Sequence, residues 1–123
     1  MQARAPEDLG ERSFRFTCDA FDYCEALVKC GGLSARVGYQ LWDAASSVGA
    51  NRAESKSAYS AKEFAAKNAI CLKESRETVF WLRLAEMKQL GDATTRQYLL
   101  AESTQLVAIF VTIVRTLQTR LNA

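Results

Sequence analysis

The sequence predicts an all-α protein, an antiparallel up-down-up-down four-helix bundle that assembles with copies of itself. Three observations lead to this class. Apolar residues recur at three- and four-residue steps along four long segments, short breaks separate these segments, and no segment alternates with the period of a strand.

The first two predicted helices have residues typical of helix ends. The first runs from about residue 13 to residue 30 and stops at Gly31 and Gly32, because glycine adopts a left-handed cap at low cost. Its predicted buried face consists of Phe14, Cys18, Phe21, Cys24 and Val28. The second runs from about residue 34 to residue 56, with Ser34 as its N-cap. Its predicted buried face consists of Val37, Leu41, Ala44 and Val48.

The third predicted helix starts at a capping box. Ser60 and Glu63 have the required spacing, and the helix is expected to run to about residue 90, before Gly91. One side of it carries Ile70, Glu74, Glu77, Trp81 and Ala85. Residues 79–82 are apolar on every side, which a solvent-facing helix does not tolerate. The fourth helix is expected from about residue 94 to residue 121.

The fourth helix is apolar around most of its circumference, since residues 106–114 include a single polar side chain, Thr112. So much apolar surface in a small protein requires either unusually deep burial or cover by a second copy. We favour the second copy. The residues expected to serve the core or the contact between copies are Trp81, Phe110 and Val111.

Length and composition predict one soluble domain. The chain has 123 residues and one proline, and we expect a poorly ordered tail over residues 1–11 and a single bundle domain over residues 12–122. The first residues lack the features of a signal peptide, and we expect no apolar stretch that reaches the roughly 18 residues of a membrane span. We therefore expect a cytoplasmic protein without a membrane partner.

The cysteine and histidine content argues against an enzyme. Cys18, Cys24 and Cys30 recur every six residues, which on a helix turns them to three different sides, so they cannot converge on one metal ion. With Cys71 they are expected to be small buried hydrophobes in a reducing compartment. The chain has no histidine, which removes the usual nucleophile–base pairs and zinc sets. We expect no catalytic residue, no metal and no cofactor.

Four polar residues continue the predicted apolar faces and are expected to form a structural polar core: Asn51, Glu54, Glu74 and Glu77. Hydrogen bonds between helices would fix the register of the bundle, because buried polar groups are costly unless they are paired. Three other interpretations remain open: contact with nucleic acid or a partner protein, a carboxylate metal site, and acid–base chemistry. Di-metal bundles use Glu-x-x-His motifs, however, and no substrate-binding loop accompanies these carboxylates.

The sequence resembles a known bacterial family, the 23S ribosomal RNA intervening-sequence proteins. Two blocks of the sequence carry the resemblance. In the first, residues 40–54, the matching positions are Gln40-Leu41, Ala44-Ala45, residues 47–51 and Ala53-Glu54. In the second, residues 62–82, they are residues 62–64, Ala69-Ile70, residues 72–74, Glu77-Thr78 and Trp81-Leu82. It implies a four-helix bundle that forms a ring-like homopentamer. A related branch, the accessory variability determinant of diversity-generating retroelements, is a basic pentamer that binds nucleic acid and works with a reverse transcriptase.

Two functions follow from the resemblance and the charge pattern. The net charge is +2, and the basic excess lies between residues 52 and 88. A ring of copies could bind RNA or DNA through repeated weak contacts, for which the candidate residues are Arg36, Arg52, Lys56, Lys62 and Lys67. The alternative is a protein-interaction or scaffold module whose partner is a reverse transcriptase or another protein. A charged face that merely solvates the helices has the same pattern.

Overall fold

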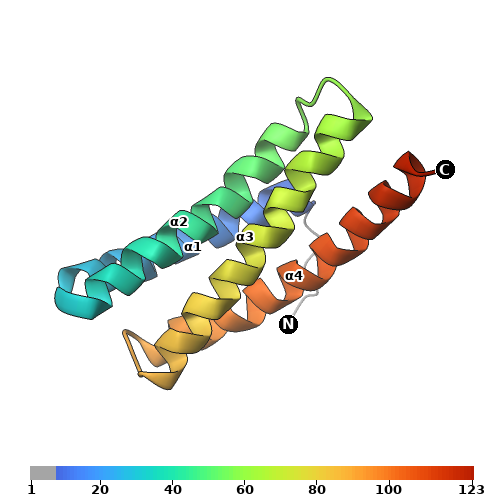
Figure 1. Cartoon of the computed structure of the whole chain (residues 1–123). Helices are drawn as coiled ribbons and strands as arrows, with labels where there is room; N and C mark the ends of the chain where they lie inside the picture. Colours follow the sequence, from blue (N-terminus) through green and yellow to red (C-terminus); the bar gives the residue numbers. More distant parts are fainter. Residues whose placement is uncertain (1–7) are drawn as a thin grey trace, which may run out of the picture.

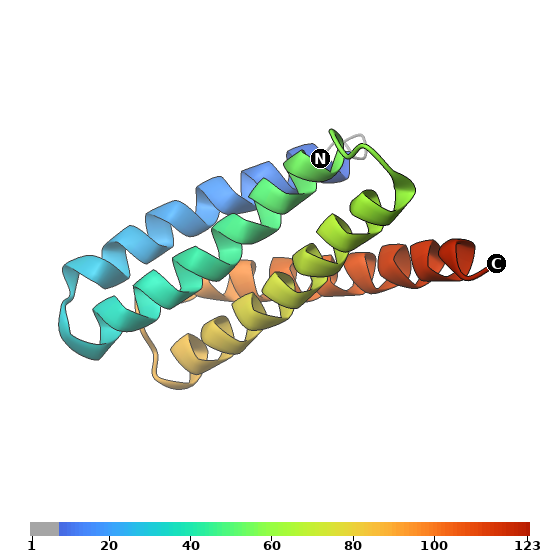
Figure 2. The same cartoon turned by 45° about the horizontal axis from the view of Figure 1, so that its top comes forward.

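The computed structural model describes residues 8–123, which form four helices and no strand. They are α1 (Leu9–Lys29), α2 (Gly32–Ser55), α3 (Ala61–Met87) and α4 (Ala93–Leu121). Each helix reverses the direction of the one before it (Figures 1 and 2). Consecutive helices pack along their lengths, whereas α1 and α4 contact each other much less and α1 and α3 do not meet. The predicted four-helix, all-α fold is confirmed.

The first helix begins earlier than predicted. Asp8 is its N-cap, and the Asp8 side chain accepts a hydrogen bond from the backbone N–H of Glu11 at 3.0 Å. Residues 8–11 therefore form the cap and first turn of α1 rather than part of a tail. The remainder of the predicted tail, residues 1–7, lies outside the described residues.

The other helix ends largely follow the predicted signals. Gly31 and Gly32 have φ values of 70° and 59°, so the chain turns on left-handed glycines and α2 starts at Gly32, two residues before Ser34. Ser60 accepts a hydrogen bond from the Glu63 N–H at 3.0 Å, and the Glu63 carboxylate accepts one from the Tyr59 N–H at 3.0 Å. The predicted Ser60 cap is confirmed, whereas the Glu63 carboxylate accepts from the N–H of Tyr59 in place of that of Ser60.

The buried faces agree with the prediction for α2 and differ for α1. The predicted residues of α2 are all buried, from Val37 to Val48. In α1, Phe14, Cys18 and Phe21 are exposed, and only Cys24 of the predicted face is fully buried. The core is instead formed by another row of the same helix, Phe16, Ala20, Tyr23, Cys24 and Leu27. The predicted face of α1 was wrong because the helix carries two apolar rows and the core takes the other one.

A similar correction applies to α3. Ile70 is exposed, and Glu74, Glu77 and Trp81 are only partly buried. The buried row is displaced around the helix by about one residue and consists mainly of small side chains, Asn68, Cys71, Ser75, Thr78, Leu82 and Ala85. Small side chains on this row let α3 lie close to its neighbours.

Two glycines of α2 allow α1 to approach closely. A Cβ atom at Gly38 would lie 3.1 Å from the backbone oxygen of Cys24, and one at Gly49 would collide with the hydroxyl oxygen of Thr17. The two helices are therefore packed almost backbone to backbone at these positions.

A buried arginine fixes the turn between α3 and α4. Arg96 is 3% exposed, and its Nη1 donates to the carbonyl oxygens of Leu90 at 2.7 Å and Gly91 at 3.2 Å. Its Nε donates to Glu86 at 3.0 Å, and the hydroxyl of Tyr23 also donates to the Leu90 carbonyl, at 2.6 Å. The turn is thereby tied to α1 as well as to α4.

Candidate functional site

Four of the five candidate nucleic-acid residues lie at one end of the bundle, where α2 ends and α3 begins. Three of the four make intramolecular interactions there. Arg52 donates to Asn68 Oδ1 at 2.7 Å and lies over the ring of Phe64, 5.8 Å from its centroid. Lys67 Nζ donates to Glu54 Oε2 at 2.8 Å, and this hydrogen bond raises the pKa of Lys67. Lys56 Nζ lies 3.7 Å from Asp8 Oδ1 and forms an ion pair with it.

Lys62 and a residue of α4 complete this charged end. Lys62 is exposed, and it forms no hydrogen bond or ion pair with any residue between 8 and 123. Arg120 lies nearby, because it lines a hollow of about 270 Å³ together with Arg52 and Phe64. In Figures 1 and 2 the last turns of α4 run apart from the start of α3. The sequence analysis missed Arg120, which is more than fifty residues from the other four.

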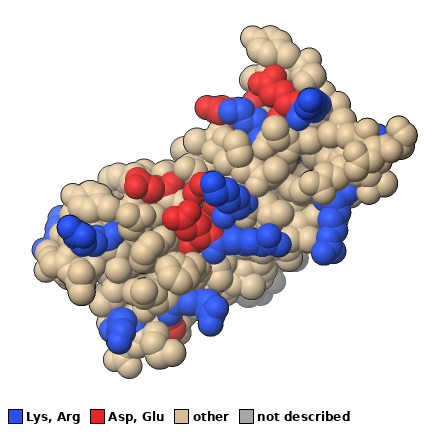
Figure 3. All heavy atoms as spheres, in the orientation of Figure 1, with Lys and Arg blue, Asp and Glu red and all other residues tan. Residues whose placement is uncertain are grey.

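The fifth candidate, Arg36, lies at the opposite end. It is separated from Lys56 by twenty residues of α2, about 30 Å along the helix. The five residues therefore do not form one surface. Figure 3 shows charged groups of both signs dispersed over one face of the subunit and separated by uncharged surface.

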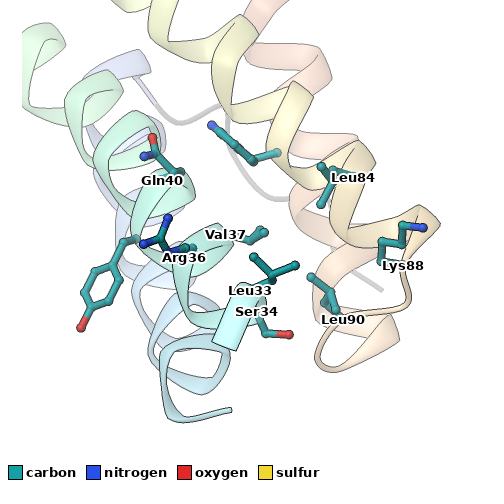
Figure 4. A pocket seen from close by; sticks show the side chains of 10 residues that line it. Leu33, Ser34, Arg36, Val37, Gln40, Leu84, Lys88 and Leu90 are labelled. Carbon is teal, nitrogen blue, oxygen red and sulfur yellow. The ribbon is translucent and has the colours of Figure 1, made fainter. Parts of the chain in front are cut away.

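Arg36 borders an apolar cleft between the start of α2 and the end of α3. The cleft has a volume of about 710 Å³. Leu33, Val37, Leu84 and Leu90 project into it, whereas the ammonium group of Lys88 points away (Figure 4). Trp81, predicted as a core or oligomer residue, also lines it. The cleft presents apolar side chains and no buried ionisable group, so it is suited to contact rather than to catalysis.

Two further apolar rows lie on the outside of the bundle. The α1 outer stripe consists of Phe14, Cys18 and Phe21, with Phe14 63% and Phe21 48% exposed. The α3 outer stripe consists of Phe80 and Met87, which are 55% and 79% exposed, and the exposed Arg76 and Arg83 lie beside it. Each stripe points away from the row of its helix that fills the core, although Phe21 also packs edge-on against Trp42 of α2, with ring centroids 5.3 Å apart.

The predicted polar core is not brought together. Glu54 lies at the surface and pairs with Lys67, and Asn51 donates to the Ser47 carbonyl of its own helix at 2.9 Å. Glu74 and Glu77 are partly buried. The pKa of Glu74 is raised, mainly by burial and secondly by the negative charge of Glu77.

The polar groups that are buried come from other positions. They include Ser13, Ser55, Asn68, Ser75, Thr78 and Ser103, in addition to Arg96 and Glu102. Arg12 donates to both carboxylate oxygens of Glu102, at 2.8 and 2.7 Å, and to Gln105 at 2.7 Å. The hydrogen bonds from Arg12 to Glu102 lower the pKa of Glu102. They also join α1 to α4, two helices that otherwise contact each other little.

Burial distinguishes the two explanations of the apolar α4. An 18-residue window of α4 has a mean hydropathy of 1.4, so by length and composition the helix could cross a membrane. This corrects the expectation that no apolar stretch is long enough for a membrane span. The core helix of a soluble protein has the same property. Only 28% of that window is buried, which argues against unusually deep burial. Phe110 is in the core, and Val111 is partly exposed.

The remaining site predictions concern metals and cysteines. Within residues 8–123 no group of three or more His, Cys, Asp or Glu side chains is arranged to hold a metal ion. Cys24 and Cys71 are buried as expected, and burial raises their pKa values to about 12 and about 11. Cys18 and Cys30 are exposed, which corrects the expectation for these two.

Comparison with known proteins agrees with the sequence resemblance. Residues 8–112 match the family described as 23S rRNA-intervening sequence protein. A crystal structure from Bacteroides thetaiotaomicron, described as a protein with unknown function from the S23 ribosomal protein family, is similar to the chain with a TM-score of 0.76. Its sequence is 24% identical, and the similarity covers 85% of this chain and 96% of that one, which shows a shared fold. A search of curated proteins gives no match.

The family match extends through α1, α2 and α3 and well into α4. No enzyme family is indicated by either comparison that gave a match. The chain belongs to the 23S rRNA-intervening sequence protein family.

Proposed function

We propose that the protein is a non-enzymatic homo-oligomer, a pentameric ring of the kind that the family resemblance implies. The observation that carries this proposal is the apolar surface of the single subunit. The large apolar side chains left exposed include Phe14, Phe21, Leu33, Phe80 and Met87, while α4 is apolar yet mostly unburied. Soluble monomers rarely expose large apolar surfaces, and repeated copies would cover them.

We propose in addition that the oligomer binds RNA or DNA. The supporting observation is the charged end of the bundle, where Lys62 is exposed in the first turn of α3 and Arg120 is exposed beside the partly buried Arg52. Arg52, Lys56 and Lys67 have intramolecular partners, so this end of one subunit offers few free cations. Affinity for phosphate grows with the number of cationic contacts, and a ring repeats each contact once per subunit.

A protein-interaction module is the second candidate, with a reverse transcriptase or another protein as its partner. The cleft between α2 and α3 favours it, because its walls are formed by Leu33, Val37, Leu84 and Leu90. A partner with an apolar side chain or helix would fit such a surface.

The self-assembly proposal is tested by sedimentation of the purified chain at micromolar concentration. The subunit mass is 13.7 kDa, and we expect a single species of several times that mass. A monomer under these conditions would refute the proposal.

The nucleic-acid proposal is tested with structured RNA and duplex DNA of two lengths, over a series of salt concentrations. We expect binding that tolerates sequence changes, favours the longer ligands and weakens steeply with salt. Replacing Lys62 and Arg120 by Gln should weaken binding at every sequence without changing the oligomer mass. The matched control is Lys29→Gln, which should leave binding unchanged. Lys29 is an exposed residue of α1 whose Nζ lies 3.7 Å from Glu25 Oε1. If neither ligand is retained at low ionic strength, the interaction module takes first place.

A further inference from the structure

We propose that the subunits assemble head to tail, with the α1 outer stripe of one copy packed on the α3 outer stripe of the next. The inference rests on the proposed self-assembly and names its contact surfaces. α1 and α3 do not approach each other closely within the bundle, any more than α2 and α4 do, and α2 lies between α1 and α3 in the view of Figure 2. Their outer sides are therefore available to two different neighbours.

The α1 outer stripe has the form of a helix-packing seam. Residues 14, 18 and 21 follow one another at four- and three-residue steps, the spacing of a coiled-coil seam. Phe14 and Phe21 are the most prominent side chains of this row. Phe14 is largely exposed, and about half of Phe21 remains exposed although its ring packs edge-on against Trp42 of α2. Asp22 and Glu25 are exposed beside Phe21, so the C-terminal part of the seam is flanked by negative charge, although Glu25 also lies 3.7 Å from Lys29.

The α3 outer stripe provides a matching receptor. A hollow of about 330 Å³ is lined by Phe80, Arg83, Leu84, Met87 and Lys88. Its first four members are at positions i, i+3, i+4 and i+7 of one helix, the arrangement of the hole that accepts a knob in knobs-into-holes packing. Arg76 and Arg83 are exposed on either side of Phe80, so this stripe is flanked by positive charge.

The two stripes agree in spacing and in charge. Phe14 and Phe21 are seven residues apart, as are Phe80 and Met87, which places each pair about 10 Å apart along its helix. Both apolar side chains of one stripe can therefore contact both of the other at once. Opposite charges beside the seam select this pairing over contacts between two α1 or two α3 stripes, which would bring like charges together.

The different chemistry of the two stripes determines the type of assembly. A contact between two unlike surfaces is heterologous, and repetition of such a contact closes into a ring when the rotation per subunit allows. A twofold dimer would instead need one surface that is complementary to itself. The two stripes of this chain are complementary to each other.

The test exchanges the charges of the two stripes. One variant carries Asp22→Arg and Glu25→Arg, a second carries Arg76→Glu and Arg83→Glu, and a third carries all four changes in one chain. All four positions are exposed, so circular dichroism should show unchanged helix content. Sedimentation should give the mass of a monomer for the first two variants and the wild-type oligomer mass for the third, in which complementarity is restored.

The control and the refuting results separate this inference from the proposed function. Arg36→Glu with Lys62→Glu reverses two exposed cations that lie off both stripes and off α4, and it should leave the oligomer intact. If the wild-type chain is oligomeric and the first two variants remain so, or if the third variant stays monomeric, the pairing of stripes is refuted while self-assembly stands. A monomeric wild-type chain refutes both.

Discussion

The contact between Gly49 and Thr17 allows a direct measurement of how tightly α1 and α2 are fitted. In Gly49→Ala the new methyl carbon would overlap the hydroxyl oxygen of Thr17, while Ser13 O at 3.4 Å and Thr17 Cβ at 3.5 Å stay at ordinary distances. The hydroxyl donates to the Ser13 carbonyl at 2.9 Å. It can move aside only by giving up this hydrogen bond.

Two opposing terms set the expected effect. Alanine favours the helix over glycine by about 1 kcal/mol. Overpacking of a close contact, here including the displaced hydrogen bond, costs typically about 1–3 kcal/mol, so the overlap should win. We expect Gly49→Ala to lower the free energy of unfolding by about 1 kcal/mol. In a Thr17→Ala background the obstacle is absent, and the same substitution should raise the free energy of unfolding by about 1 kcal/mol. The interaction energy between the two sites is then about 2 kcal/mol.

The assay is urea unfolding of the wild-type chain, both single variants and the double variant. One protein concentration is used throughout, because assembly would make stability depend on concentration. Gly10→Ala is the control: a Cβ there meets Lys56 Nζ at 3.0 Å and the N-cap oxygen Asp8 Oδ1 at 3.1 Å but not Thr17, so its effect on stability should be the same with and without the Thr17 hydroxyl. Equal effects of Gly49→Ala with and without the Thr17 hydroxyl would show that this contact does not limit the approach of the helices.

Three further predictions concern buried and partly buried polar groups. Arg96→Met should lower the free energy of unfolding by about 2 kcal/mol, measured in urea, because the carbonyls of the α3–α4 turn lose their buried donor. Burial raises the pKa of Tyr23 from 10.0 to about 12 and that of Cys24 from 9.0 to about 12. The unfolded chain therefore releases these protons first, and thermal melts should show stability falling as the pH rises from 9 to 12. Divalent metal ions should leave the melting temperature unchanged, and a large rise that Glu74→Ala or Glu77→Ala abolishes would establish the metal-site interpretation of these carboxylates.

The sequence was sufficient to predict the helices but not which sides of them face inward. Periodicity identified four helices and the Ser60–Glu63 cap, because these features depend on residues a few positions apart. α2 has one apolar row, and its buried face was predicted correctly. α1 has two apolar rows, one through Phe14 and Phe21 and one through Phe16 and Leu27. The periodicity of the sequence does not indicate which of these rows faces the core.

The polar contacts were harder to predict, because they depend on tertiary structure. Arg12 and Glu102 are 90 residues apart, so nothing local pairs them. Glu54 continues the apolar face of α2 in sequence, yet it occurs in the last turn of the helix, where it reaches Lys67 at the surface. Arg96 follows the cap of α4 and resembles any surface arginine until the turn before it is folded over its guanidinium group.

The weak contact between α1 and α4 bears on how the chain folds. Almost all packing joins helices that are consecutive in sequence, so only short loops have to close before most of the apolar surface is buried. Chains with mainly local contacts fold within microseconds to milliseconds. Links across the α1–α4 seam, such as that between Arg12 and Glu102, can form only when both helical hairpins are docked. We therefore expect the seam to slow unfolding while adding little to the rate of folding.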